Sequence, residues 1–220
     1  MSDRLNRLAP LTGVVLIALL VAGGALIGNE PKSGATAARV ISFYHSHRTK
    51  IELSAYLTGL SVFFGLFFYG LLRDRLGRAE SARRLASTAF AGAVTFAVGG
   101  TLSAGTMIAL ADVPGKLGAG AAQALNVLEN DLALFADGVG IAVLLMGSGL
   151  AILRGRQLPT WLGWAAIAFS VASLLPVRFV DLPLAAIWTL TASILLFRRG
   201  GASLPEPYTT LAQPLTSAAG

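Results

Sequence analysis

Cysteine is absent from this chain of 220 residues, and charged residues make up only 13% of it. Without cysteine the chain has no disulfide framework and no thiolate ligand for zinc or an iron–sulfur cluster, and thiol-dependent catalysis is excluded. Soluble domains carry about 25% charged residues, so the scarcity of charge argues against an ordinary water-soluble fold.

What the chain has in excess is apolar sequence, since 55% of its residues are hydrophobic and its mean hydropathy is +0.70. A transmembrane helix needs about 20 mostly apolar residues, because about 30 Å of hydrocarbon is crossed at about 1.5 Å per residue. We therefore predict an all-α fold, a polytopic membrane helix bundle of six transmembrane helices within residues 1–199. The six spans cover residues 9–28, 51–72, 85–111, 132–153, 160–177 and 179–197.

The two ends of this predicted domain differ in character. Arg4 and Arg7 precede the first apolar run and small residues follow it, which is also the pattern of a cleaved signal peptide. The apolar run reaches about 20 residues, beyond the 7 to 15 of a signal peptide, so we favour a retained first helix. Residues 200–220 contain three prolines and no periodic apolar pattern, which predicts a disordered cytoplasmic tail.

The basic residues indicate the orientation of the bundle, because short loops rich in lysine and arginine stay on the cytoplasmic side. With the N-terminus inside, the inner segments hold eleven of the 17 basic residues, and seven of the eleven acidic residues lie on or near the outer side. We therefore predict a multi-pass protein of the cell (inner) membrane with both termini cytoplasmic. The net charge of +6 follows from this topology and does not indicate a nucleic-acid partner.

Two of the predicted outer loops carry helical patterns, from which we expect two extracytoplasmic interfacial helices. In the first loop, residues recur at steps of three and four: Ala37, Val40, Tyr44, Arg48 and Ile51. In the second loop, one apolar face is formed by Leu117, Ala121, Ala124, Leu128 and Leu132.

Asp137 is the first candidate for a functional side chain, because an ionisable group inside a span usually points at a cavity or a partner. A span that starts at Leu132 places Asp137 about 8 Å along the helix, whereas a span that starts at Gly138 covers only about 24 Å before Arg154. We favour the first placement. Asn126 and Asn130 then fall close to the helical face of Asp137, which predicts a polar stripe that descends from the outer loop.

Two roles remain open for this stripe. In the functional interpretation, Asp137 accepts a proton or a cation in an outward-facing vestibule. In the structural interpretation, it pairs with an outer cation such as Arg178 or Lys50. We favour the structural role, because a transport pathway ordinarily has ionisable groups deep in several spans. The candidate polar site comprises Asp137, Asn130, Arg178 and Glu52, the last of which lies one turn from Arg48.

The sequence shows no pattern typical of a metal site or of a catalytic site. His45 and His47 point about 160° apart on a helix, so they cannot jointly hold a metal ion. No spacing brings together the outer acids Asp112, Glu129, Asp131 and Asp181, for which solvated loop charge is the favoured account. The chain has no phosphate-binding glycine loop, no His-Glu-x-x-His and no Gly-x-Ser-x-Gly. We therefore expect no catalytic residues, no metal and no cofactor.

One resemblance adds to this interpretation. Tyr44, His45, His47 and Arg48 enter the second span, Leu158-Pro159-Thr160-Trp161-Leu162-Gly163-Trp164 opens the fifth, and Arg198-Arg199 closes the sixth. With these motifs, residues 35–199 resemble an uncharacterised family of six-helix membrane proteins that is common in actinobacteria. The resemblance implies a fold and a membrane location, and it carries over no mechanism and no catalytic residue.

The leading hypothesis is a non-enzymatic accessory or apolar-ligand-binding protein. Its expected partner is membrane lipid, with a second copy of the chain or another membrane protein as further candidates. The alternative is a small proton- or cation-coupled transporter or channel that uses Asp137, and a membrane enzyme ranks third.

Overall fold

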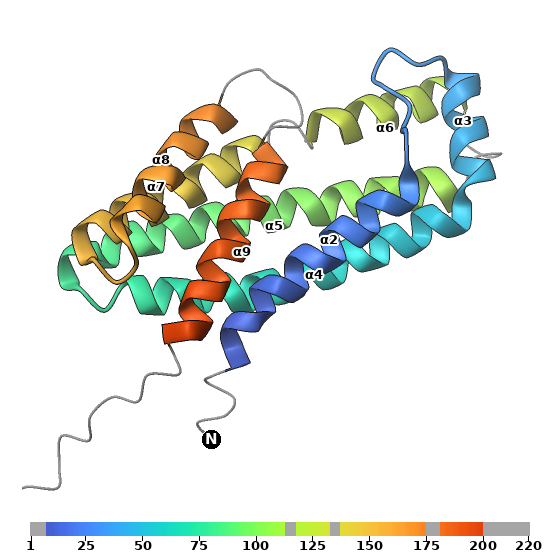
Figure 1. The fold of residues 1–220 in the computed structure, drawn as a ribbon. Helices are drawn as coiled ribbons and strands as arrows, with labels where there is room; N and C mark the ends of the chain where they lie inside the picture. Colours follow the sequence, from blue (N-terminus) through green and yellow to red (C-terminus); the bar gives the residue numbers. More distant parts are fainter. Residues whose placement is uncertain (1–7, 113–117, 133–136, 175–180, 200–220) are drawn as a thin grey trace, which may run out of the picture.

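The computed structural model describes residues 8–112, 118–132, 137–174 and 181–199. Within these ranges the chain is helical apart from short connections and contains no strand, which confirms the predicted all-α class for the described residues (Figure 1). The helices are η1 (Ala9–Leu11), α2 (Thr12–Ile27), α3 (Ala37–Ser46), α4 (Arg48–Leu76), α5 (Glu80–Asp112), α6 (Ala119–Leu132), α7 (Gly138–Gly155), α8 (Thr160–Ser173) and α9 (Asp181–Arg199).

Five of the predicted spans correspond to helices that are long and apolar enough to cross a membrane. These are η1 with α2, α4, α5, α7 and α9. The helix at the fifth predicted position, α8, is apolar but has only 14 residues, or about 21 Å of length. The expected end of that span falls partly in residues 175–180, which lie outside the described residues. The structure therefore supports a bundle of membrane-spanning type without establishing six crossings.

The fourth predicted span corresponds to α7 over residues 138–153. Residues 133–136, between the end of α6 at Leu132 and Asp137, lie outside the described residues, so the predicted start of that span at Leu132 stays a prediction. Asp137 stands directly before α7. Both loops with a predicted helical pattern contain a helix, α3 and α6.

The helices α6 and α7 lie one after the other along α5 and run antiparallel to it (Figure 1). Small residues set this register: a Cβ atom added at Gly140 would touch the backbone of Phe96, and one added at Gly147 would touch Ala89. Toward the C-terminal end of α5, the hydroxyl of Ser103 donates a hydrogen bond to Glu129 of α6. The 33 residues of α5 extend about 50 Å, close to the roughly 21 Å of α6 plus the roughly 27 Å of α7.

The closest backbone approach in the bundle is between α5 and α7. A Cβ atom added at Gly92 would lie 2.4 Å from the backbone nitrogen of Leu144, a separation that real Cβ atoms essentially never show. Ala89 and Ala93, which stand four residues apart on the same helix, are both buried. Helices in lipid approach closely only where the side chains are small, so these residues hold α5 and α7 in van der Waals contact.

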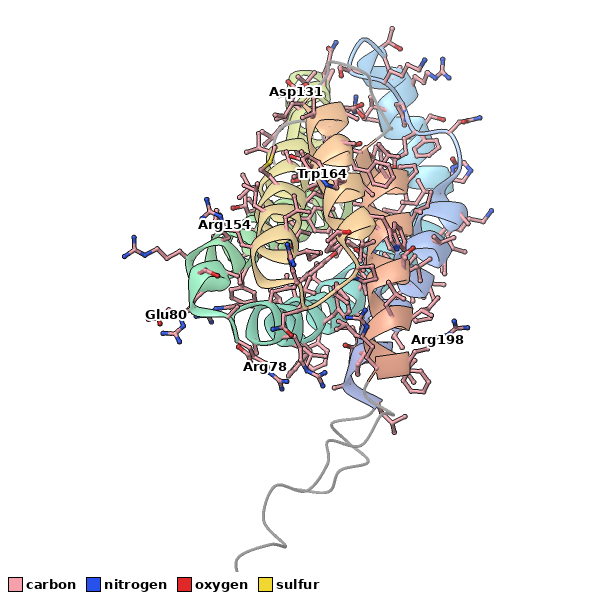
Figure 2. All side chains as sticks on the ribbon, turned by 60° about the vertical axis from the view of Figure 1, so that its left-hand side comes forward. Arg78, Glu80, Asp131, Arg154, Trp164 and Arg198 are labelled. Carbon is pink, nitrogen blue, oxygen red and sulfur yellow. The ribbon has the colours of Figure 1, made fainter. Side chains whose placement is uncertain are left out.

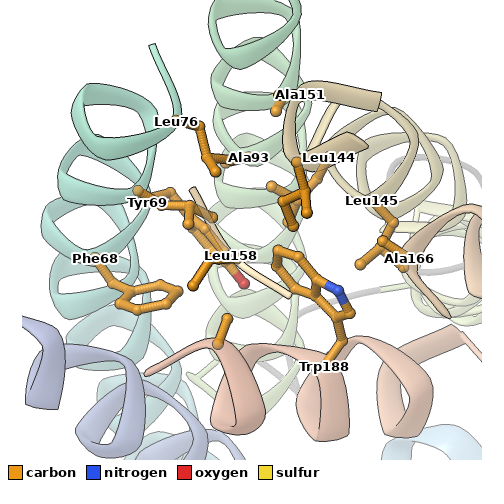
Figure 3. Packing of buried hydrophobic residues seen from close by; sticks show 14 of the residues in the cluster. Phe68, Tyr69, Leu76, Ala93, Leu144, Leu145, Ala151, Leu158, Ala166 and Trp188 are labelled. Carbon is orange, nitrogen blue, oxygen red and sulfur yellow. The ribbon is translucent and has the colours of Figure 1, made fainter. Parts of the chain in front are cut away.

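Large side chains form the core where α9 packs against α2, α7 and α8. Figure 3 shows Phe68 and Tyr69 of α4, Leu144 of α7 and Trp188 of α9 in one buried cluster. The indole Nε1 of Trp188 donates to the carbonyl of Leu162 at 3.1 Å, and the hydroxyls of Tyr69 and Thr189 bond at 3.0 Å. Each buried polar group named here therefore has a partner, as an apolar interior requires.

Charge divides the molecule into two ends. In Figure 2, Arg78, Glu80 and Arg198 lie in the lower part of the molecule, Arg154 lies at mid-height and Asp131 lies near the top. One end holds the α4–α5 turn, the α7–α8 turn and the last turn of α9, with nine arginines: Arg73, Arg75, Arg78, Arg83, Arg84, Arg154, Arg156, Arg198 and Arg199. We call it the arginine end, and we call the end with α3 and α6 the outer end.

The contact between α5 and α7 makes a stability prediction. Replacing Gly92 with Ala forces the two backbones apart, and we expect a loss of about 1–3 kcal/mol in the free energy of unfolding. Gly105→Ala on the same helix is the matched control, because nothing lies within 4 Å of its added Cβ and alanine favours the helix. Thermal unfolding in detergent, followed by tryptophan fluorescence, measures both. Equal melting temperatures for the two variants would contradict the close approach.

Candidate functional site

A cavity of about 100 Å³ lies between α2, α4 and α5, with Asp137 and Leu182 completing its wall. It exists because small residues of α4 and α5 leave the space between the helices unfilled, among them Gly65, Ala97 and Gly100. Its larger lining side chains are apolar: Leu16, Leu20, Val62, Leu66, Phe96 and Met107. Such a surface suits an apolar ligand.

Polar side chains of this cavity concentrate toward the outer end. Thr58 and Ser61 of α4 and Ser103 of α5 line its outer half, Asp137 lies near its middle, and Tyr69 lines the inner half. The hydroxyl of Ser61 donates to the carbonyl of Thr58 at 2.7 Å, and the hydroxyl of Ser103 donates to Glu129 at 2.9 Å. These hydroxyls therefore already have partners.

Asp137 differs from these hydroxyl groups. It is only 9% exposed, and its Oδ1 has no hydrogen-bond partner among the described residues. The charged groups that act on it are the carboxylates of Asp181 and Glu129. Asp181 lies at the start of α9, where its Oδ2 would be 3.8 Å from a Cβ atom added at Gly138. The result is a buried acceptor on the cavity wall with like charges around it.

The predicted cation partner of Asp137 is not found in the described part of the chain. Lys50 is exposed at the start of α4, and Arg178 lies outside the described residues. Among the described residues, the ion pairs all involve Arg48, which bonds to Glu52 at 2.7 Å and to Asp112 at 2.6 Å. Glu52 therefore helps to connect the outer ends of α4 and α5, and the structure does not bring it to the cavity.

Beyond the cavity lies a second set of polar groups, which we call the outer polar cluster: Glu30, Tyr44, Ser103, Asn126, Glu129 and Asn130. Asn126 is fully buried and Glu129 is 5% exposed. The amide nitrogens of Asn126 and Asn130 donate to the carbonyls of Lys32 at 3.2 Å and Pro31 at 3.3 Å. These bonds hold the α2–α3 connection against α6, and Ser103 joins this cluster to the cavity.

The apolar face of α6 that the sequence shows is not its buried face. Ala121 and Ala124 are exposed and Leu128 is 49% exposed, while the polar face of the helix is buried. Apolar side chains gain little from burial where the surroundings are themselves apolar, whereas polar groups there must find partners inside the protein. The two remaining residues of that expected face, Leu117 and Leu132, have no described side chain.

Burial and neighbouring negative charge raise the pKa values of the acidic groups in the outer polar cluster. Burial, and then the neighbouring Glu129, raise the pKa of Glu30 to about 7. Burial raises the pKa of Glu129, and its bond from Ser103 opposes this shift. The pKa of Tyr44 is raised by burial and by both carboxylates, and among the described residues its hydroxyl and Asn126 Oδ1 are buried without partners. The cluster is therefore rich in acceptors, and a carboxyl group that keeps its proton there acts as a donor.

The remaining sequence candidates do not form a metal site. His47 Nδ1 lies 3.0 Å from the carbonyl of Phe43 and ends α3, and His45 is exposed. Within the described ranges, no group of three His, Asp or Glu residues is close enough to hold a metal ion.

Comparison of the chain with protein families, with curated proteins and with solved structures found no match. The geometry alone therefore defines the class: an all-helical protein of membrane-spanning type with an apolar cavity and buried carboxyl groups beside it. Of the predicted site residues, Asp137 lies on the cavity wall and Asn130 lies in the adjoining outer polar cluster. Sequence reasoning missed Glu30 and the burial of Glu129, although Asn126, Glu129 and Asn130 share one helical face by their spacing of three and four.

The raised pKa of Glu30 predicts how stability changes with pH. Between pH 4.5, the ordinary value, and about 7, the unfolded chain loses this proton before the folded chain does, so stability falls as the pH rises. Glu30→Gln should reduce that fall, with each kcal/mol retained worth about 2–4 °C in Tm. Melting curves from pH 4.5 to pH 8 measure the slope. Asp131→Asn, at an exposed acid of α6, is the control and should keep the wild-type slope.

Proposed function

We propose that this protein is a non-enzymatic, multi-pass protein of the cell (inner) membrane that binds a small apolar molecule or a lipid chain in its central cavity. The cavity between α2, α4 and α5 is the observation that carries this proposal. Apolar cavities of roughly 150 Å³ stay dry and bind a molecule the size of benzene, so about 100 Å³ suits a small ring or a short alkyl segment.

The proposed membrane arrangement has six spans, with α8 as the fifth and both termini cytoplasmic. The charge distribution supports it, because among the described residues the arginine end gathers nine arginines and two acids, Asp74 and Glu80. The helices α8 and α9 also support it, since α8 starts at the arginine end and α9 returns to that end. In this arrangement α3 and α6 lie at the outer interface, and the chain is a member of the six-helix actinobacterial family that it resembles.

A second candidate function is a small proton-coupled carrier, and Asp137 is the observation that favours it. This carboxylate lines the cavity directly before α7 and is buried beside the carboxylates of Asp181 and Glu129. Ionisable side chains buried in membrane proteins commonly mark a proton or ion pathway. In proteoliposomes, Asp137→Asn would abolish uptake driven by a proton gradient if the protein is a carrier. A binding protein would show no such uptake in either form.

The binding function is tested by filling the cavity. In lipid nanodiscs, a photoactivatable six-carbon alkyl diazirine should label residues 93–107 of the wild-type chain. Gly100→Leu places a large side chain in the cavity, where the added Cβ has only Val62 within 4 Å, and should reduce that labelling to background. Gly105→Leu, at an exposed and open position of the same helix, is the matched control and should keep it. Equal labelling of both variants would mean that the probe contacts only the lipid-facing surface.

A further inference from the structure

We infer that the ligand of the central cavity is an amphipathic cation, an alkylammonium-like molecule whose charged head lies beside Asp137 and whose apolar body lies against the inner half of the cavity. This inference rests on the proposed binding function and adds the chemical class of the ligand.

The shape of the cavity supports a ligand with a head and a body. Its lining residues extend from Thr58 to Tyr69 along α4 and from Ala93 to Met107 along α5, which correspond to about 17 and 21 Å of helix. The hydroxyl groups lie in the outer half and Asp137 lies near the middle, while the inner half is apolar except for Tyr69, whose hydroxyl is already bonded to Thr189. An elongated molecule with one polar end matches this division.

Asp137 is the group that recognises the head. Asp137 lines the cavity, and its Oδ1 is buried without a hydrogen-bond partner among the described residues. A buried acceptor without a partner costs about 1–3 kcal/mol, and more when it is charged. An ammonium group satisfies both needs, because it donates a hydrogen bond and supplies the missing positive charge.

The wider electrostatic environment favours the same sign of charge. The charged groups that act on Asp137 are Asp181 at the start of α9 and Glu129 on α6, and both are acids. The start of α7 contributes about half a positive charge, which one carboxylate more than balances. Arg48 is bound to Glu52 and Asp112, while Lys32, Arg39 and Lys50 are exposed. A carboxylate head would therefore be repelled, and an alcohol would gain only a neutral hydrogen bond.

Proton release should accompany binding of the cation. In the empty site, burial and then the nearby carboxylates of Asp181 and Glu129 disfavour the ionised form of Asp137. An arriving ammonium favours the ionised form of Asp137, and the displaced proton leaves to water. Binding of a cation should therefore tighten as the pH rises, whereas binding of a neutral molecule with the same body should not follow the titration of Asp137.

Three molecules with one body and different heads test this inference: hexylammonium, hexanol and hexanoate. Each competes with the alkyl diazirine for labelling of residues 93–107 in full-length protein in phosphatidylcholine nanodiscs. We expect hexylammonium to compete at a concentration about tenfold below that of hexanol, since a charged hydrogen bond exceeds a neutral one by about 1.4 kcal/mol, and hexanoate to be the weakest. Asp137→Asn should remove the advantage of hexylammonium, and Asp131→Asn should leave it unchanged.

The order of the three heads on the wild-type chain suffices even if Asp137→Asn does not fold. Equal competition by all three would overturn the cationic class while leaving the apolar binding function standing. Strongest competition by hexanoate would also overturn it, because a cation such as Arg178 would then have to lie beside Asp137. Absence of competition together with unchanged labelling in Gly100→Leu would overturn the binding function as well.

Discussion

The contact between α5 and α7 is the constraint on which the rest of the structure depends. Gly92, Gly140 and Gly147 leave no room for side chains there, so the two backbones touch and these glycines fix their register. That register places Asp137 on the wall of the cavity and continues outward to the bond between Ser103 and Glu129. Van der Waals contact between small residues thus positions both polar sites.

The orientation of α6 is the clearest sign of the environment for which this chain is built. A helix on a water-soluble protein hides its apolar face, whereas α6 hides Asn126, Glu129 and Asn130 and exposes Leu128. Buried in this way, the polar face holds the α2–α3 connection and the hydroxyl of Ser103. The arrangement suits the membrane interface, where the outward apolar face can contact lipid.

Much of the fold could be predicted from the sequence, because long apolar runs and clustered arginines are local signals. The helices at 9–27, 48–76, 80–112 and 181–199, and both helices of the outer loops, follow from such signals. The sequence did not place the start of α7 at Gly138, since a span that starts at Leu132 satisfies the length of a membrane crossing better. Periodicity also revealed that α6 has two faces without revealing which one is buried, because that choice depends on what surrounds the helix.

The site was less predictable for a related reason. Asp137 could be identified from the sequence because it is a single acid within an apolar run. The cavity could not, because it forms between small residues of α4 and α5, and the sequence of one helix does not show what faces it. Glu30 and Glu129 are 99 residues apart and resemble ordinary loop acids until α6 packs against the α2–α3 connection. Arg178 lies outside the described residues, so its predicted pairing with Asp137 stays a prediction.

Both the cavity proposal and its ligand class require the two ends of the bundle to lie on opposite sides of a membrane. Since the chain has no cysteine, single substitutions give unique labels: Gly34→Cys at the exposed outer end and Arg78→Cys at the arginine end. A membrane-impermeant maleimide applied to intact cells should label position 34 and should reach position 78 only after the membrane is opened. Labelling of both positions in intact cells, or of position 78 alone, would contradict the proposed arrangement.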